Sequence, residues 1–185
     1  AENDKPGTTD WQFTYVKFDP KAKFRQSLIE GYCDRVSVRA EETITFFVSA
    51  SAPTPVTIDL YRLGYYGGAG ARKVRSYGSL NAPTQPDPAI GAKRVRDCRW
   101  EPSLVIDIDP DWLSGVYLAK LSAAGAEGAQ SHVVFIVRDD RRADLMFQCS
   151  DFTWQAYNRW PDHFSLYDDG KSEWYWGGGV QISFN

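Results

Sequence analysis

The stretch TITFFVS, residues 43–49, alternates between two kinds of position in a way that predicts a β-strand. Its even-numbered positions, Ile44, Phe46 and Val48, are all apolar and lie on one face of such a strand. Successive side chains of a strand point to opposite faces, so a period of two buries one face and leaves the other in a different environment. This stretch therefore predicts a fold that contains β-strands.

The same period recurs along the chain, between turns rich in Gly, Pro, Ser and Asp. The predicted strands are residues 36–39, 43–49, 56–63, 73–77, 103–108, 116–122 and 131–137, and Cys33 is expected to end a further strand. Turn-forming residues at 109–115 and 123–129 and a Pro-rich surface loop at 81–91 separate them. Seven short strands at this spacing predict a mainly β fold, an immunoglobulin-like β-sandwich.

Length and charge limit the function classes. The 185 residues suffice for one domain with a sizeable core, or for a domain with an appendage. A net charge of -3 and a pI near 5.4 argue against a nucleic-acid partner, which would need a concentrated basic surface. No apolar run approaches the ~18 residues that a membrane span requires. The polar start at Ala1 suits a mature secreted or periplasmic protein, and a trimmed cytoplasmic chain equally well.

The cysteines and histidines offer little metal chemistry. Cys33 and Cys98 could close a long loop as a disulfide, or all three cysteines, with Cys149, could be unpaired and buried as small hydrophobes. Their spacing fits no zinc motif, and His132 and His163 are far apart in sequence, which excludes a His-rich metal centre. His132 lies within an apolar strand and is expected to be a core or edge residue.

Two glycine clusters have simple structural explanations. Residues 64–72 (GYYGGAGAR) lack both GxGxxG and a Walker motif, and no helix pattern follows them, so phosphate binding is not expected. We predict a loop whose glycines adopt positive φ, with Tyr65 and Tyr66 packed on the sandwich. Residues 177–179 (GGG) are predicted to form a turn.

The last part of the chain is aromatic without being periodic. Residues 151–185 contain ten aromatic side chains but no sustained helix or strand period. Such a segment must cover the β-sandwich or pack against a partner, because large exposed apolar patches on soluble proteins mark interaction sites. The aromatic tail is therefore predicted to link this chain to another part of a larger functional unit.

Five motifs carry a resemblance to a known family. They are residues 29–53, 58–72, 112–121, 133–140 and 153–160, which includes TWQAYNRW. Together they resemble the N-terminal half of proteins related to the large subunit of N,N-dimethylformamidase. The resemblance implies an immunoglobulin-like or jelly-roll-like β-sandwich ahead of an α/β catalytic domain. The implied domains are an N-terminal extension (1–27), the sandwich (28–140) and the start of a split catalytic domain (141–185), with residues 143–150 as its first strand.

The resemblance also implies a site. The family's characterised member hydrolyses a small amide with a mononuclear iron held by two tyrosines and one glutamate. Tyr157 in WQAYN matches the first tyrosine, and the other ligands would fall beyond Asn185, on a larger C-terminal chain from the same precursor in a hetero-oligomer. Asn158 would then act catalytically by orienting substrate or the ligand loop. A pocket for a small amide substrate would be walled by Trp154, Trp160, Trp174 and Trp176, although each ring could equally serve packing alone.

Two other function classes stay open from the sequence. Flat rings at Tyr65, Tyr66, Trp112 and residues 174–176 could form a platform of an extracellular carbohydrate- or protein-binding module without catalysis. A purely structural subunit that shields a catalytic chain is the third. An enzyme subunit needs Tyr157 in a crevice at an interface, whereas a sugar platform needs coplanar, exposed rings.

Overall fold

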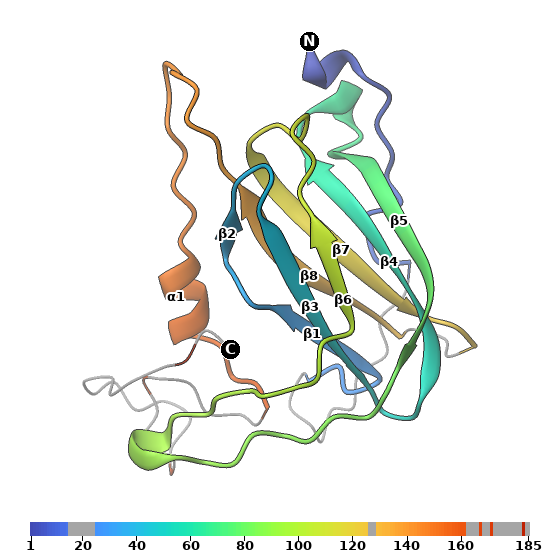
Figure 1. The fold of residues 1–185 in the computed structure, drawn as a ribbon, viewed down its shortest axis with the longest axis vertical. Coiled ribbons are helices and arrows are strands. Elements are labelled where there is room, and N and C mark those ends of the chain that lie inside the picture. Colours follow the sequence, from blue (N-terminus) through green and yellow to red (C-terminus); the bar gives the residue numbers. More distant parts are fainter. Residues whose placement is uncertain (15–24, 126–128, 162–166, 168–170, 172–182, 184–185) are drawn as a thin grey trace. The chain divides into compact units, whose positions relative to one another are not determined.

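The chain is mainly β in a computed structural model that describes residues 1–14, 25–125, 129–161, 167, 171 and 183 (Figure 1). The strands are β1 (Ile29–Cys33), β2 (Ser37–Val38), β3 (Thr43–Ala50), β4 (Thr54–Leu63), β5 (Ala71–Ala82), β6 (Leu104–Asp107), β7 (Gly115–Ala123) and β8 (Gln130–Val137). Among the described residues, helical structure is limited to the 3-10 turns η1 (Glu2–Asp4), η3 (Tyr66–Gly68) and η4 (Ala92–Arg94) and to the helix α1 (Asp151–Ala156).

The chain divides into two compact units. One, here called the β unit, comprises residues 1–17, 26–85 and 100–140, and the other, the aromatic unit, comprises residues 18–25, 86–99 and 141–185. All the strands belong to the β unit and form two sheets, with strand orders β1-β3-β6 and β2-β8-β7-β4-β5. Neighbouring strands are antiparallel except β2, which pairs with β8 in parallel.

The two sheets share one hydrophobic core. Ile44, Phe46 and Val48, the apolar face predicted from TITFFVS, are each at most 1% exposed. Phe46 of the three-stranded sheet meets Phe135 of the five-stranded sheet edge to face, with ring centroids 5.7 Å apart. Tyr117 in turn stacks on Phe135 at 5.4 Å. The mainly β prediction is confirmed, and the period of two is the reason, because it directs alternate side chains of each strand into this core.

Two features bear on the type of sandwich. The short strand β2 runs parallel to β8 through hydrogen bonds from Ile136 N to Val36 O (3.0 Å) and from Arg138 N to Val38 O (2.9 Å). The Tyr117 hydroxyl donates to Leu113 O, four residues upstream, at 2.8 Å. A tyrosine bonded back to the preceding corner is a feature of immunoglobulin-like sandwiches. It supports that type, which stays a prediction against the jelly-roll alternative.

The seven predicted strands are present, and the differences have physical causes. β5 is longer than predicted, because its weakly patterned second half pairs with β4 across register shifts near Val56 and Leu60. Residues 143–150 lie outside every strand, and their apolar side chains Leu145, Met146 and Phe147 are 84–89% exposed. No described strand pairs with them, so this strand stays a prediction for a completed catalytic domain.

The N-terminal segment (residues 1–14) packs on the five-stranded sheet beside β5. Thr8 N donates to Ala71 O at 2.8 Å, and Trp11 Nε1 donates to Ala69 O at 2.9 Å. Buried Lys120 donates from Nζ to Asp10 O and Gln12 O, both at 2.7 Å. The backbone carbonyls of this segment therefore satisfy an ammonium group that would otherwise be buried without partners.

The glycine loop at residues 64–72 is as predicted in its backbone and partly wrong in its side chains. Gly67, Gly68 and Gly70 have φ values of 65°, 92° and 86°. Tyr66 is buried, but Tyr65 is 71% exposed, contrary to the prediction that both rings pack on the sandwich. The turn directs the two side chains differently, and it is the Tyr66 hydroxyl that finds polar partners, in Glu2 and Arg62.

The polar residues that could have held a metal or a disulfide have other roles. None of the three cysteines is in a disulfide bond among the described residues. The Cys33 thiol is buried and contacts Arg35 O at 3.2 Å, and burial raises its pKa to about 12. Cys149 is only half-buried. His132 contacts Trp11 O at 2.8 Å and stacks on Phe13, a packing role as predicted.

None of the described helices is long and apolar enough to cross a bilayer.

Candidate functional site

The predicted site residues lie on and just after helix α1 (Asp151–Ala156) in the aromatic unit. The helix begins after Ser150, whose carbonyl accepts from Trp154 N at 2.9 Å, and Asp151 places a negative charge in its first turn, where the helix dipole favours one. Tyr157 ends it and donates from its backbone N to Thr153 O at 3.1 Å. This short helix therefore presents Trp154 and Tyr157 from adjacent turns.

Tyr157, the predicted iron ligand, is accessible. Its side chain is 53% exposed, and its ring lies 5.1 Å from that of Tyr167. Within the described part of the chain there is no group of three His, Cys, Asp or Glu side chains placed to hold a metal ion. Of the three implied ligands, the described residues supply Tyr157.

Asn158, the predicted catalytic residue, makes local contacts. Its Oδ1 accepts a hydrogen bond from Trp160 N at 3.0 Å, and its Nδ2 lies 3.5 Å from Gln155 Oε1. Asparagine side chains often fix the backbone two residues on in this way. The contact gives Asn158 a clear role in shaping the turn after α1, and its action on a substrate stays a prediction.

The predicted tryptophan wall is described in part. Trp154 is 51% exposed. Trp160 is half-buried, and the guanidinium of Arg25 lies 5.3 Å from the centroid of its ring, within the range of a cation–π interaction. Trp174 and Trp176 lie outside the described residues. The structure thus gives the first two rings different surroundings, one open and one capped by a cation.

An ion pair in the aromatic unit was not predicted from sequence. Arg25 donates from Nη1 and Nη2 to the two carboxylate oxygens of Asp87, at 2.8 and 2.7 Å. This bidentate hydrogen bonding from Arg25 lowers the pKa of Asp87. The partners are 62 positions apart and follow no motif, so no sequence signal could have paired them.

A second unpredicted contact holds α1 in place. Gln155 on the helix donates from Nε2 to Ser183 O at 2.6 Å. The Ser183 hydroxyl donates to Asp97 Oδ1 at 2.7 Å, and this hydrogen bond lowers the pKa of Asp97. A residue near the end of the chain therefore connects the helix to the loop that precedes β6.

Several large apolar side chains on α1 and in the residues before it are exposed. Large exposed side chains are concentrated in one part of the sequence: Leu145, Met146, Phe147, Phe152, Trp154 and Tyr157 are 51–89% exposed. Exposed apolar clusters of this kind mark interaction sites. Chemically, the described part of the unit offers the exposed phenol of Tyr157, the amide of Asn158 and apolar side chains suited to burial against another polypeptide.

Comparison with known proteins supports the resemblance. The sequence model of the family described as N,N-dimethylformamidase beta subunit-like, C-terminal, matches residues 57–185. No curated protein sequence matches the chain significantly. Among solved structures, the alkylpurine DNA glycosylase AlkC of Pseudomonas fluorescens, bound to DNA containing an abasic site analogue, is similar over 61% of this chain and 31% of its own, with 14% identity and a TM-score of 0.31. Similarity at that level supports no inference.

The family match contains most of β4 and all of β5, β6, β7, β8 and α1, together with the residues around Tyr157. It spans well over half of the chain and includes four of the five motifs completely. The protein therefore belongs to the N,N-dimethylformamidase beta subunit-like family.

Proposed function

We propose that this protein is one chain of a two-chain metallohydrolase that resembles N,N-dimethylformamidase and cleaves a C–N bond of a small amide. The observation that carries the proposal is the family match over residues 57–185, which contains Tyr157 and Asn158. The second chain would be the larger catalytic chain, derived from the same precursor. The pair would form the catalytic site at their interface.

The apolar surface of the aromatic unit supports a partner. Full burial of a large apolar side chain contributes about 1.5 to 3 kcal/mol. Leu145, Met146 and Phe147 are 84–89% exposed and form no strand, so this contribution is not realised within the described chain. Pairing of residues 143–150 with a strand of the second chain would bury these side chains and satisfy their backbone groups.

Tyr157 is the proposed contribution to the metal. Its exposed phenol is available to a ligand set completed by the second chain. Phenolate oxygen is a hard donor suited to iron, and a bound metal ion would supply the charge that stabilises the ionised form. Asn158 would fix the turn that holds Tyr157, and Trp154 and Trp160, with Trp174 and Trp176, would form the wall of the amide pocket.

The alternative, a sugar-binding or protein-binding module, loses most of its described platform. Trp112 is 9% exposed and stacks on Tyr117 at 5.3 Å, with the two rings nearly parallel. Tyr66 is 3% exposed. Of the three described residues predicted to form the platform, Tyr65 is the exposed one. A single ring makes a poor stacking surface.

The test is native mass spectrometry with iron analysis of the protein purified without denaturant, together with an assay for amine release from a small amide. The proposal expects a stable larger partner, about one iron per pair and Tyr157-dependent activity. Tyr157→Phe should lower iron content and activity at least tenfold while leaving the pair intact.

Tyr65→Phe is the matched control, because it removes an exposed phenol from the β unit. It should leave iron, activity and pairing unchanged. Full iron occupancy and activity in Tyr157→Phe would exclude Tyr157 as the ligand. A protein that carries neither partner nor iron as isolated from its native source would overturn the two-chain metallohydrolase itself.

A further inference from the structure

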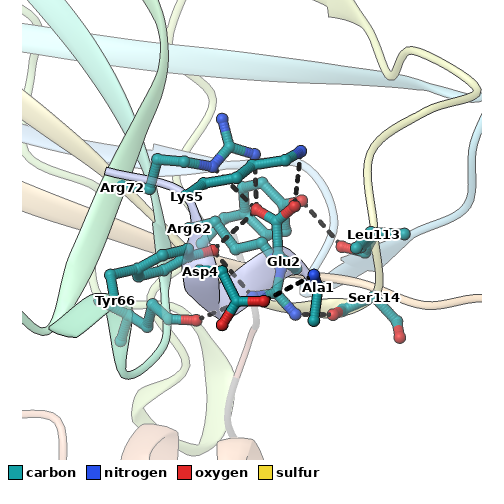
Figure 2. Close-up of polar contacts among 11 residues, drawn as sticks. Ala1, Glu2, Asp4, Lys5, Arg62, Tyr66, Arg72, Leu113 and Ser114 are labelled. Atoms are coloured by element: carbon teal, nitrogen blue, oxygen red, sulfur yellow. Dashed lines mark hydrogen bonds and ion pairs between the residues drawn. The ribbon is translucent and has the colours of Figure 1, made fainter. Parts of the chain in front are cut away.

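One carboxylate in the β unit is recognised by an unusually complete set of donors. Glu2 Oε1 accepts from Arg72 Nη2 at 2.7 Å, from Arg72 Nε at 2.8 Å and from the Tyr66 hydroxyl at 3.0 Å (Figure 2). Glu2 Oε2 accepts from Lys5 Nζ at 2.7 Å. The Glu2 side chain is 10% exposed. All the donors to Oε1 come from the β4–β5 region, whereas Lys5 belongs to the same N-terminal segment as Glu2.

A second layer orients these donors. Arg62, at the end of β4, donates from Nη1 to the Tyr66 hydroxyl at 2.9 Å and from Nη2 to Ser114 O at 2.7 Å. A tyrosine hydroxyl has one proton to donate, and the bond accepted from Arg62 leaves that proton for Glu2. Arg62 therefore fixes the direction in which Tyr66 donates and adds a second positive charge behind it.

The backbone is shaped to make this arrangement possible. Tyr66 has a φ of 42°, a left-handed conformation that is costly for a residue with a large side chain. Gly115 lies against Arg62, and a Cβ there would come within 3.2 Å of Nε and Nη2. The strained backbone of Tyr66 and the absence of a side chain at Gly115 therefore allow the Tyr66 and Arg62 side chains to take these positions.

The site also has capacity that Glu2 does not use. Arg62 Nε is buried and has no hydrogen-bond partner in the described structure. Arg72 and Lys5 contact the Glu2 carboxylate directly, and Arg62 acts on it through the Tyr66 hydroxyl. Removal of that carboxylate would leave the partly buried Arg72 without its anion, which is unfavourable.

The N-terminal segment begins with the 3-10 turn η1 and then continues along the start of β5, like a bound peptide. Thr8 forms an antiparallel bridge with Ala71 at the start of β5, and Trp11 donates from its indole to Ala69 O at 2.9 Å. Main-chain hydrogen bonds at a sheet edge with pockets for selected side chains are how strand addition recognises peptides. In this view Glu2 fills the side-chain pocket that gives specificity.

We propose that Arg62, Tyr66 and Arg72 form a binding site for the glutamate side chain of a peptide, and that Glu2 is its occupant from within the chain. The ligand class is an acidic peptide that lies along the start of β5. The site belongs to the β unit and does not depend on the proposed metallohydrolase activity.

The experiment uses the full chain carrying Glu2→Ala. The probe is a fluorescently labelled, N-acetylated peptide with the sequence of residues 1–14, and a second probe replaces its glutamate with glutamine. The glutamate probe should bind the Glu2→Ala chain at least tenfold more tightly than the unaltered chain, whose site is filled. The glutamine probe should bind the Glu2→Ala chain at least tenfold more weakly than the glutamate probe does. Hydrogen exchange of the Thr8 amide reports separately whether the segment is released.

Further variants of the Glu2→Ala chain distinguish specific binding in the pocket from non-specific attraction of the probe to positive charge. Arg72→Met should abolish binding of the glutamate probe, whereas Lys73→Met, the next cation along β5, should not change it. Equal binding of the two probes would overturn carboxylate recognition. Full protection of the Thr8 amide in Glu2→Ala would overturn the claim that Glu2 holds the segment in this site. Release of the segment without binding of the probe would overturn the site itself.

Discussion

Phe135 and Phe147 are the same residue type in two regions with opposite outcomes. Phe135 of β8 is fully buried, against Phe46 and Tyr117, whereas Phe147 is 84% exposed. The difference lies in the surrounding pattern. In the β unit, apolar residues recur with the period of a strand and meet across two sheets. Around Phe147 they are consecutive and have no described partner. Apolar content alone does not make a core, because the period decides which side chains can meet.

The largest effect on stability should come from truncating Phe135, and truncation of Phe147 is its comparison. Phe135→Ala removes a ring from a packed core and should lower the free energy of unfolding by about 3 to 5 kcal/mol. Phe147→Ala should change it by less than about 0.5 kcal/mol, as is usual for exposed positions. Urea unfolding of the two variants, followed by tryptophan fluorescence and circular dichroism, measures both. Equal losses would show that the aromatic unit has a core as dependent on Phe147 as the β unit is on Phe135.

In the proposed complex, the same Phe147→Ala variant should weaken the association of the two chains. If residue 147 is buried by the larger chain, its truncation should weaken association by about 1.5 to 3 kcal/mol. Dissociation constants from titration of the separated chains would show this. Tyr65→Ala, which removes an exposed ring from the β unit, is the control and should leave association unchanged. A null effect of Phe147→Ala would place the partner surface elsewhere.

A smaller effect tests how far the β unit depends on its N-terminal segment. Burial of Glu2 would raise its pKa, but hydrogen bonds from Lys5, Arg72 and Tyr66 outweigh burial and lower the pKa from 4.5 to about 2. Because the folded pKa is the lower one, the stabilisation is complete above pH 4.5 and is lost as the pH falls toward 2.

Glu2→Gln should therefore cost on the order of 1 to 2 kcal/mol at pH 6, as expected for hydrogen bonds to a charged group. The gap between this variant and the unaltered chain should narrow at pH 3. Urea midpoints at the two pH values provide the measurement. A gap that stays constant with pH would mean that the carboxylate charge contributes nothing to stability.

The smallest effect should come from the corner before β7. Tyr117→Phe removes the hydroxyl that donates to Leu113 O and keeps the ring in the core. The expected cost is about 1 kcal/mol, the net contribution of a typical hydrogen bond. Thermal unfolding of this variant beside Tyr65→Phe, in which the lost hydroxyl is on an exposed ring, isolates the bond. Equal melting temperatures would show that the Tyr117–Leu113 hydrogen bond does not contribute to the stability of the β unit.

Much of the fold could be predicted because the pattern that indicates a strand lies within the residues of that strand. The alternation in residues 43–49 was enough to assign β3 and its buried face, and each of the other six predicted strands has a counterpart. The full extent of β5 could not be predicted, since its second half, with Ser79 at a φ of 61°, is set by pairing with β4 rather than by its own pattern.

The sites were less predictable because they join distant positions. Tyr157 and Asn158 were identified only through a resemblance, and their proposed chemistry stays untested. Glu2 and Arg72 are 70 positions apart, and neither belongs to a motif. The loop at residues 64–72 was recognised as unusual for its glycines, but only the fold shows that those glycines aim Tyr66 at a carboxylate.

The parallel pairing of β2 with β8 has a mechanical consequence. The chain enters β2 from its N-terminal side and leaves β8 toward the aromatic unit, and the two strands point the same way. A force that pulls the two ends of the chain apart would act along the strands in opposite directions. It would load the Ile136–Val36 and Arg138–Val38 hydrogen bonds together, in shear, instead of opening them one after the other. The shortest described strand is thus placed where it resists tension between the chain that precedes β2 and the chain that follows β8.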